Sequence, residues 1–159
     1  MERDASLEHS LGAQVRRTER ALHRLLQHHL AAHDVPVGMW YFLRVLWEED
    51  GLSQRELAAR VHATPAATAE QLSNMEARAL LVRRPSNTDR RSKTVHLTEQ
   101  GRALRDVLMR YPREIEDHAF QGLSVAETSF LHICLARIRR NLDEYEARLD
   151  VSARDEEGQ

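Results

Sequence analysis

The fold is decided by the stretch Arg83-Arg84-Pro85-Ser86-Asn87-Thr88-Asp89-Arg90-Arg91-Ser92-Lys93-Thr94-Val95-His96-Leu97-Thr98. A short strand at 80–84 and an alternating strand at 93–97 flank turn-forming residues at 85–89. The quoted stretch holds five cationic residues and one anionic residue, a local charge of +4, whereas the whole chain sums to −2. Positive charge concentrated on a hairpin predicts a β-wing that contacts DNA phosphates.

Two short helices joined by a tight turn precede this hairpin. The first begins at Ser53, which has the spacing of a capping box with Glu56. The second begins at Thr64-Pro65, an N-cap residue followed by proline at the first helical position, and extends to about residue 79. Two such helices followed by a hairpin predict a winged helix-turn-helix. The residues expected to face inward on the second helix are Thr68, Leu72, Met75 and Ala79.

Longer helices are predicted on both sides of this module. Apolar residues three or four apart indicate helices at about 6–33 and 37–49. A helix from Thr98 to about 121 is expected to break near Pro112, because proline cannot donate the backbone hydrogen bond. A last helix to about residue 150 carries a heptad seam, which requires a partner helix. The seam consists of Leu131, Leu135, Ile138, Leu142, Tyr145 and Leu149.

These elements predict a mainly α-helical fold with a small two- or three-stranded β-wing. The architecture is a winged helix-turn-helix flanked by N- and C-terminal dimerisation helices. Residues 1–36 are expected to form the N-terminal part of the dimerisation region and 37–98 the winged helix-turn-helix. Residues 99–150 are expected to form the C-terminal dimerisation helices and 151–159 a polar, disordered tail.

Composition narrows the class of protein. The 159 residues, 42% of them apolar, fit one domain, or one domain with a dimerising extension. Cys134 is the only cysteine, so no intrachain disulfide is expected, and we expect it to be a buried structural residue. Neither a signal peptide nor a membrane span is indicated, which favours the cytoplasm. No nucleophile–base set, P-loop or dinucleotide fingerprint occurs, so we expect no enzyme activity and no cofactor.

Residues 50–104 resemble the MarR family of winged-helix transcriptional regulators. The resemblance is carried by three motifs: Leu52-Ser53-Gln54-Arg55-Glu56-Leu57-Ala58, Met75-Glu76-Ala77-Arg78-Ala79-Leu80-Leu81, and an Asp-x-Arg wing at 89–91 followed by Leu97-Thr98-Glu99-Gln100-Gly101. It implies a homodimer with interlocked first and last helices that binds a pseudo-palindromic operator, by default as a repressor. Many members release DNA on binding a small aromatic or phenolic acid. Within the family, the sequence of residues 38–47 resembles that of regulators of aromatic-compound catabolism. Ala79 stands where the family has glycine, so no positive φ is expected there.

The candidate DNA-binding residues lie on both short helices and on the hairpin. On the second helix, Gln71 and Asn74 can pair with adenine, and Glu70 can accept a hydrogen bond from cytosine. The exposed face of that helix lacks basic residues, so the wing is expected to supply an unusually large share of the affinity. Asp89 can orient a neighbouring arginine. The full set is Ser53, Gln54, Thr64, Ala66, Ala67, Glu70, Gln71, Asn74, Arg84, Asp89, Arg90, Arg91 and Lys93.

An effector pocket is expected between the first two long helices. Arg16 or Arg20 would pair with the carboxylate of an aromatic acid, and Met39, Trp40 and Leu43 would surround its ring. The alternative is that these apolar residues pack the junction between the dimerisation and DNA-binding parts.

Two alternative functions remain open at this stage. A metal-responsive regulator is suggested by His23, His28, His29 and His33, although these fit solvated helix residues better and no metal site is assigned. A dimeric winged-helix adaptor that binds protein and little or no DNA is suggested by Glu70 and the lack of arginine on the second helix.

Overall fold

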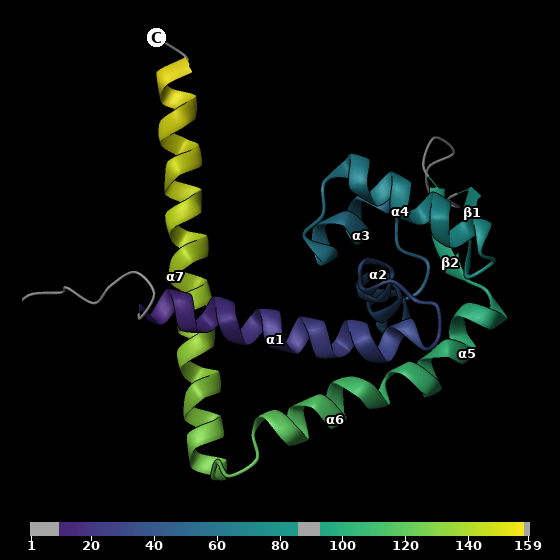
Figure 1. The fold of residues 1–159 in the computed structure, drawn as a ribbon. Helices are drawn as coiled ribbons and strands as arrows, with labels where there is room; N and C mark the ends of the chain where they lie inside the picture. The colour runs from purple at the N-terminus through teal and green to yellow at the C-terminus, as the bar shows by residue number, and fades with distance from the viewer. Residues whose placement is uncertain (1–9, 86–92, 158–159) are drawn as a thin grey trace, which may run out of the picture. The chain divides into compact units, whose positions relative to one another are not determined.

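The computed structural model describes residues 10–85 and 93–157. The chain divides into two compact units, Met1–Glu116 and Asp117–Gln159. In the first unit, four helices precede an antiparallel hairpin, and a fifth helix and most of a sixth follow it (Figure 1). This arrangement is the predicted winged helix-turn-helix. From the start of the first unit to the end of its fifth helix, the elements are α1 (Leu11–Ala31), α2 (Val37–Glu48), α3 (Gln54–Val61), α4 (Pro65–Ala77), β1 (Leu81–Pro85), β2 (Lys93–Leu97) and α5 (Glu99–Leu108).

Helix α1 is separated from α2 by a short corner. The Ser10 hydroxyl caps α1 by accepting from the Ala13 amide at 3.2 Å. The corner residue Asp34 has a φ of 56°, and Pro36 directly precedes α2. The expected helix start near residue 6 lies outside the described residues.

The helix-turn-helix begins with the predicted capping box. Ser53 N donates to the Glu56 carboxylate at 2.8 Å, and Glu56 N donates to the Ser53 hydroxyl at 3.2 Å. The turn passes through His62, whose φ is 53°. Thr64 then caps α4 by accepting from the Ala67 amide at 3.2 Å. Helix α4 ends at Ala77, before the expected end near residue 79.

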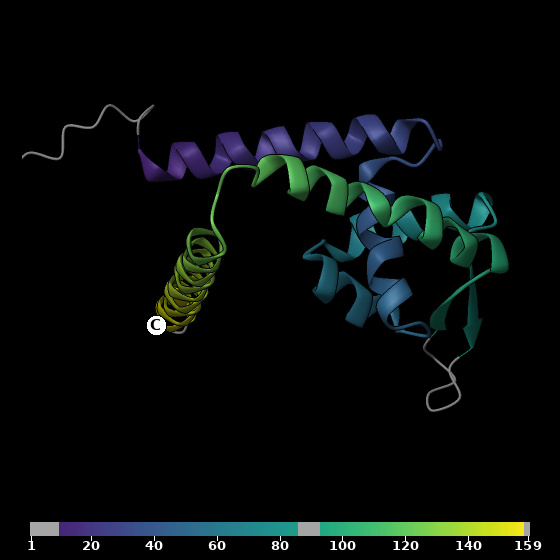
Figure 2. The same ribbon diagram turned by 90° about the horizontal axis from the view of Figure 1, so that it is seen from below.

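The two strands of the wing pair antiparallel, with Leu81 opposite Leu97 and Pro85 opposite Lys93. In Figure 2 they extend away from the helices of the first unit. A third strand is reduced to one isolated bridge between Ser53 and Thr94. Next to it, Gly51 N donates to Val95 O at 2.9 Å. Of the expected turn residues 85–89, Pro85 belongs to β1, where it pairs with Lys93, and 86–89 lie outside the described part of the chain.

The core of the first unit holds α2, α3, α4, the hairpin and α5 together. Its apolar side chains come from every one of these elements and are largely closed to solvent. Fully buried members include Leu43, Leu57, Leu72, Met75, Leu81, Val95 and Leu108.

The helix that follows the wing breaks where proline predicted it. Helix α5 ends at Leu108, Met109 forms a turn, and α6 runs over Arg110–Ala119. Pro112 is the third residue of α6, in the first turn, where a backbone N–H has no intrahelical partner. The beginning of α6 lies beside the end of α1 (Figure 2), where Tyr111 contacts His33.

The second unit is dominated by α7 (Val125–Glu157). Its predicted capping box is present, because Ser124 N donates to the Glu127 carboxylate at 2.8 Å and the Ser124 hydroxyl accepts from Glu127 N at 3.3 Å. The helix extends past residue 150, so the expected disordered tail at 151–159 is replaced by helix as far as Glu157. No proline or glycine stops the helix before Gly158.

The heptad seam of α7 is exposed in the single chain. Exposure ranges from 37% for Ile138 to 61% for Leu142. Cys134 is half-buried instead of fully buried. No helix in the described ranges, the long α7 included, is both apolar and long enough to pass through a bilayer.

Candidate nucleic-acid interface

Helix α4 is held by an apolar inner stripe. Thr68, Leu72 and Met75 are fully buried, as predicted, whereas Ala79 is exposed beyond the end of the helix. The Thr68 hydroxyl has no hydrogen-bond partner among the described residues. Because these inner residues fix the rotation of α4 about its axis, they also fix which residues face outward.

Most of the predicted recognition residues share the outward face of α4. Ala66, Ala67, Glu70 and Asn74 are exposed. Gln71 is different: it is half-buried, and its Oε1 lies 3.5 Å from the position that a Cβ on Gly38 would take. Position 71 lies three residues after Thr68 and four before Met75, on the inner side of the helix. Gln71 is therefore placed against the start of α2 and not with the other candidates.

The polar candidates at the two helix starts are engaged in capping. The hydroxyls of Ser53 and Thr64 accept hydrogen bonds from Glu56 N and Ala67 N. The hydrogen bond from Ser53 also lowers the pKa of Glu56 below its usual value. Gln54 is half-buried at the first position of α3. The hydroxyls of Ser53 and Thr64 therefore serve as N-caps of α3 and α4.

Arg84 and Lys93 are the described cations of the wing that face solvent. They lie near the end of the paired strands, Arg84 opposite Thr94 and Lys93 opposite Pro85. Neither forms an ion pair with another described residue. Asp89, Arg90 and Arg91 lie outside the described residues.

Arg83 has a different role, which the sequence did not indicate. Its Nε and Nη2 donate to Glu76 Oε2 at 2.9 and 2.5 Å, and its backbone N donates to Glu76 Oε1 at 3.2 Å. The side-chain hydrogen bond from Arg83 is the main cause that holds the pKa of Glu76 below its usual value. The ion pair joins α4 to β1, so the wing is held against the recognition helix. No local pattern indicates a contact that depends on how β1 packs on α4.

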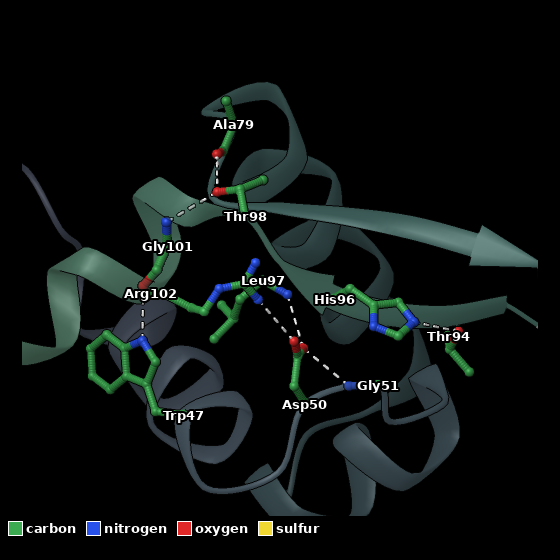
Figure 3. A network of polar contacts seen from close by, with 10 residues as sticks. All are labelled: Trp47, Asp50, Gly51, Ala79, Thr94, His96, Leu97, Thr98, Gly101 and Arg102. Carbon is green, nitrogen blue, oxygen red and sulfur yellow. Dashed lines mark hydrogen bonds and ion pairs between the residues drawn. The ribbon is translucent and has the colours of Figure 1, made fainter.

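A network of polar contacts fixes the base of the wing (Figure 3). Asp50 Oδ1 accepts from Gly51 N at 3.0 Å and from Leu97 N at 2.9 Å, and its Oδ2 lies 3.2 Å from Arg102 Nη1. Trp47 Nε1 donates to Gly101 O at 2.8 Å. The end of α2, the end of β2 and the start of α5 are therefore connected by hydrogen bonds. Sequence reasoning did not single out Asp50, because Leu97 and Arg102, two of its three partners, are 47 and 52 residues away.

Two small residues permit the close packing at this base. A Cβ on Gly101 would lie 2.1 Å from Leu80 O, so only glycine fits where α5 passes the start of β1. Thr98 bridges the same place, since its Oγ1 donates to Ala79 O at 2.7 Å and accepts from Gly101 N at 3.0 Å.

Ala79 has a φ of 55°, so the expectation that this position needs no positive φ is wrong. The chain must turn sharply between α4 and β1, and the packing of both elements imposes that conformation.

The expected effector residues are not brought together in one pocket. Met39, Trp40 and Leu43 are buried in the core, and the ring of Trp40 packs edge-on against Trp47 at 5.4 Å. Arg16 and Arg20 are exposed on α1. In the single chain these apolar residues pack the junction between α1, α2 and α5, which is the alternative that the sequence left open.

Two histidines, His29 on α1 and His33 in the corner after it, pack against Tyr111 of α6. His33 Nε2 lies 2.6 Å from the Tyr111 hydroxyl, and the His29 ring stacks on the Tyr111 ring at 4.6 Å. Arg110 Nη2 also donates to that hydroxyl at 2.8 Å, and this bond raises the pKa of Arg110. Within the described part of the chain, no group of three or more histidine, cysteine or acidic side chains is arranged to hold a metal ion.

Comparison with known proteins gives a consistent picture. The model of the MarR family matches residues 39–93. The HTH-type transcriptional regulator TtmR of Methylorubrum extorquens (strain PA1) is 30% identical over 119 residues, 75% of this chain. The chain spans only 58% of the length of TtmR. The "Putative transcriptional regulatory protein for hcr operon" of Thauera aromatica is 30% identical over 146 residues, 91% of this chain and 87% of that protein.

Solved structures share the fold. A "Putative MarR Family Transcriptional Regulator from Listeria monocytogenes complexed with 26mer DNA" superimposes with a TM-score of 0.78 and 18% identity, covering 85% of this chain and 90% of that chain. A MarR family regulator from Rhodococcus sp. RHA1 superimposes with a TM-score of 0.74 and 24% identity, covering 84% and 95%. The names of these relatives and of both solved structures describe regulators of transcription.

Proposed function

Because the chain belongs to the MarR family, we propose that it is a DNA-binding transcriptional regulator that acts as a homodimeric repressor. The observation that carries this proposal is the geometry of the first unit. Helix α4 presents an exposed face on a helix-turn-helix, and a wing with exposed Arg84 and Lys93 is joined to that helix through the Arg83–Glu76 ion pair.

In the proposed complex, α4 enters the major groove and the wing follows the phosphate backbone. Arg84 and Lys93 supply phosphate contacts, together with Arg90 and Arg91, which lie outside the described residues. Since α4 contains no lysine, arginine or histidine, the affinity depends mainly on the wing. A Listeria monocytogenes regulator of the same fold has been solved in complex with a 26mer DNA, which supports the proposal that this fold binds DNA.

The homodimer is proposed from the apolar seam of α7. Six apolar side chains at heptad spacing are between 37% and 61% exposed in the single chain, and water contact with such a seam is unfavourable. A second copy would cover it, and a two-fold dimer with one α4 helix in each chain matches the two halves of a pseudo-palindromic operator. Sedimentation equilibrium should give twice the chain mass of 18.4 kDa. Leu142→Glu should shift the mass toward monomer, whereas Arg139→Glu, on the same helix but outside the seam, should not.

The DNA-binding proposal is tested by fluorescence anisotropy with DNA from the protein's own promoter region. Binding should weaken steeply between 50 and 200 mM salt. The double variant Arg84→Ala, Lys93→Ala should weaken binding to all sequences and reduce the salt slope by roughly 0.9 for each phosphate contact removed. Arg17→Ala, an exposed cation on α1, is the matched control and should leave the slope unchanged. Unchanged affinity in the double variant would contradict the wing as the main source of affinity.

A small aromatic carboxylate is proposed as the effector that releases the DNA. Arg16 and Arg20 are exposed on α1 and can pair with a carboxylate. Because Met39, Trp40 and Leu43 are buried in the single chain, their contact with a ring requires movement between α1 and α2. Isothermal titration with a panel of aromatic acids tests this point, and the absence of binding at millimolar concentrations would refute it.

A second candidate function is a dimeric adaptor that binds protein and not DNA. The observation that favours it is the exposed carboxylate of Glu70 on an α4 without cations, since this charge repels DNA. The same anisotropy measurement separates the two functions. Equal lack of binding at 50 and 200 mM salt would favour the adaptor.

A further inference from the structure

We infer that Glu70 and Asn74 of α4 read base identity, and that Glu70 selects a C·G base pair through the amino group of cytosine. This inference rests on the proposed function, because α4 must lie in the major groove. It adds which bases are read, a question that the proposed function leaves open.

The packing of α4 places these two side chains together. Glu70 and Asn74 are four residues apart and both exposed, whereas Thr68, Leu72 and Met75 on the opposite side are fully buried. Rotating α4 to present other residues would expose this buried stripe. The fold therefore determines that Glu70 and Asn74 face a bound duplex.

Glu70 differs from most other carboxylates of the helix-turn-helix. Most of the other carboxylates form an ion pair or a hydrogen bond with a neighbouring side chain. Glu70 forms no hydrogen bond or ion pair with any residue in 10–85 or 93–157. The engaged carboxylates are Glu49, Asp50, Glu56 and Glu76, whose partners are Arg60, Arg102, Ser53 and Arg83. A free carboxylate on this face weakens binding to every sequence unless a base donor meets it.

The chemistry of the groove leaves one preferred base for Glu70. An ionised carboxylate only accepts hydrogen bonds. Guanine presents two acceptors in the major groove, thymine presents an acceptor and a methyl group, and adenine presents an acceptor beside its amino group. Cytosine presents the amino donor without an adjacent acceptor of its own. It is therefore the base that meets the Glu70 carboxylate with the least repulsion.

Asn74 sets the distance to a second readable base. Four residues of helix rise about 6 Å, and successive bases rise about 3.4 Å. An asparagine amide can pair with both N6 and N7 of adenine. Each half-site is therefore expected to contain a C·G pair and an A·T pair within about two steps of each other.

The experiment is selection of bound sequences from random duplex DNA with the full-length protein, followed by affinity measurements on a selected and an unrelated duplex. Glu70→Gln should lose the cytosine preference, lowering discrimination at that position roughly tenfold, and should admit adenine. It should also bind the unrelated duplex several-fold more tightly, because one repulsive charge per chain is removed. The control is Glu48→Gln, an exposed glutamate on α2 without an ion pair among the described residues. It should change neither the selected sequence nor the discrimination.

The outcomes separate this inference from the proposed function. If the wild-type protein selects an operator and Glu70→Gln selects the same sequence with unchanged discrimination, the inference is wrong and the proposed function stands. If Glu48→Gln tightens binding to the unrelated duplex as much as Glu70→Gln does, Glu70 acts only through net charge and the inference is also wrong. If the wild-type protein retains no DNA at 50 mM salt, both fail.

Discussion

Replacing Gly101 by alanine should disrupt the junction between the wing and α5. The added Cβ would lie 2.1 Å from Leu80 O, whereas Cβ atoms essentially never come within 3.0 Å of such an atom. Either α5 or the start of β1 must therefore move by about 0.9 Å. Leu80 O also accepts from Thr98 N at 3.1 Å, so this hydrogen bond is weakened by the same movement.

The expected cost follows from these contacts. Forcing a methyl group into a closely packed site costs about 1–3 kcal/mol. Weakening a buried hydrogen bond adds about 1 kcal/mol. Alanine in a helix regains about 0.5–1 kcal/mol relative to glycine. The free energy of unfolding should therefore fall by about 2 kcal/mol, which corresponds to about 4–8 °C in Tm for a chain of this size.

Urea unfolding followed by tryptophan fluorescence measures this effect. Trp47 is a suitable reporter, because its Nε1 donates to Gly101 O. Protein concentration must be kept constant, because association links stability to concentration. Gly12→Ala is the matched control: it makes the same chemical change in α1, where the nearest atom, Arg16 Nη1, would be 3.5 Å away. If Gly101→Ala unfolds at the same urea concentration as wild type or as Gly12→Ala, the close approach of α5 to β1 does not exist.

Three further predictions use the same unfolding assay. Ala79→Gly should raise the free energy of unfolding by about 0.5–1 kcal/mol, because Ala79 has a φ of 55° and glycine adopts this conformation without strain; a loss of stability would contradict the left-handed turn. Thr68→Val should raise it by about 1 kcal/mol, because the variant removes a buried hydroxyl without a partner among the described residues and keeps the shape; a loss would show that the hydroxyl is satisfied by water. Glu76→Gln should lower it by about 0.5–1 kcal/mol near neutral pH, since the pair with Arg83 is partly exposed. The pKa of Glu76 is lowered in the folded state, so its ion pair contributes fully to the free energy of unfolding above the usual glutamate pKa near 4.5. This contribution is lost as the pH falls through the lowered pKa of the folded protein. Plots of the free energy of unfolding against pH should therefore converge in acid for wild type and Glu76→Gln.

Two helix starts and one helix break could be predicted because their causes are local. The capping boxes of Ser53 with Glu56 and of Ser124 with Glu127 join residues three apart, and the structure confirms both. The break before Pro112 depends only on the missing backbone donor. The order of helices and strands, and hence the winged fold, follows from such signals.

The candidate site was predictable only in part. The exposed positions of Glu70 and Asn74 follow from helical periodicity once the apolar stripe is known. The same periodicity places Gln71 beside that stripe, three residues after Thr68 and four before Met75, and the structure shows its side chain against Gly38 of α2. Sequence reasoning counted Arg83 among the charges of the wing, whereas its guanidinium is neutralised by Glu76.

The sequence by itself therefore determined the winged helix-turn-helix, the placement of positive charge on the wing and the lack of cations on α4. Only the tertiary structure decided that Arg83 joins the wing to α4 and that Asp50 joins β2 to α5. It alone also decided that Gly101 lets α5 approach β1 and that Ala79 forms the left-handed turn between α4 and β1. The physical reason is the range of the interactions. Caps and periodicity act within one or two helical turns, whereas these contacts arise between elements whose approach is set by the shared apolar core.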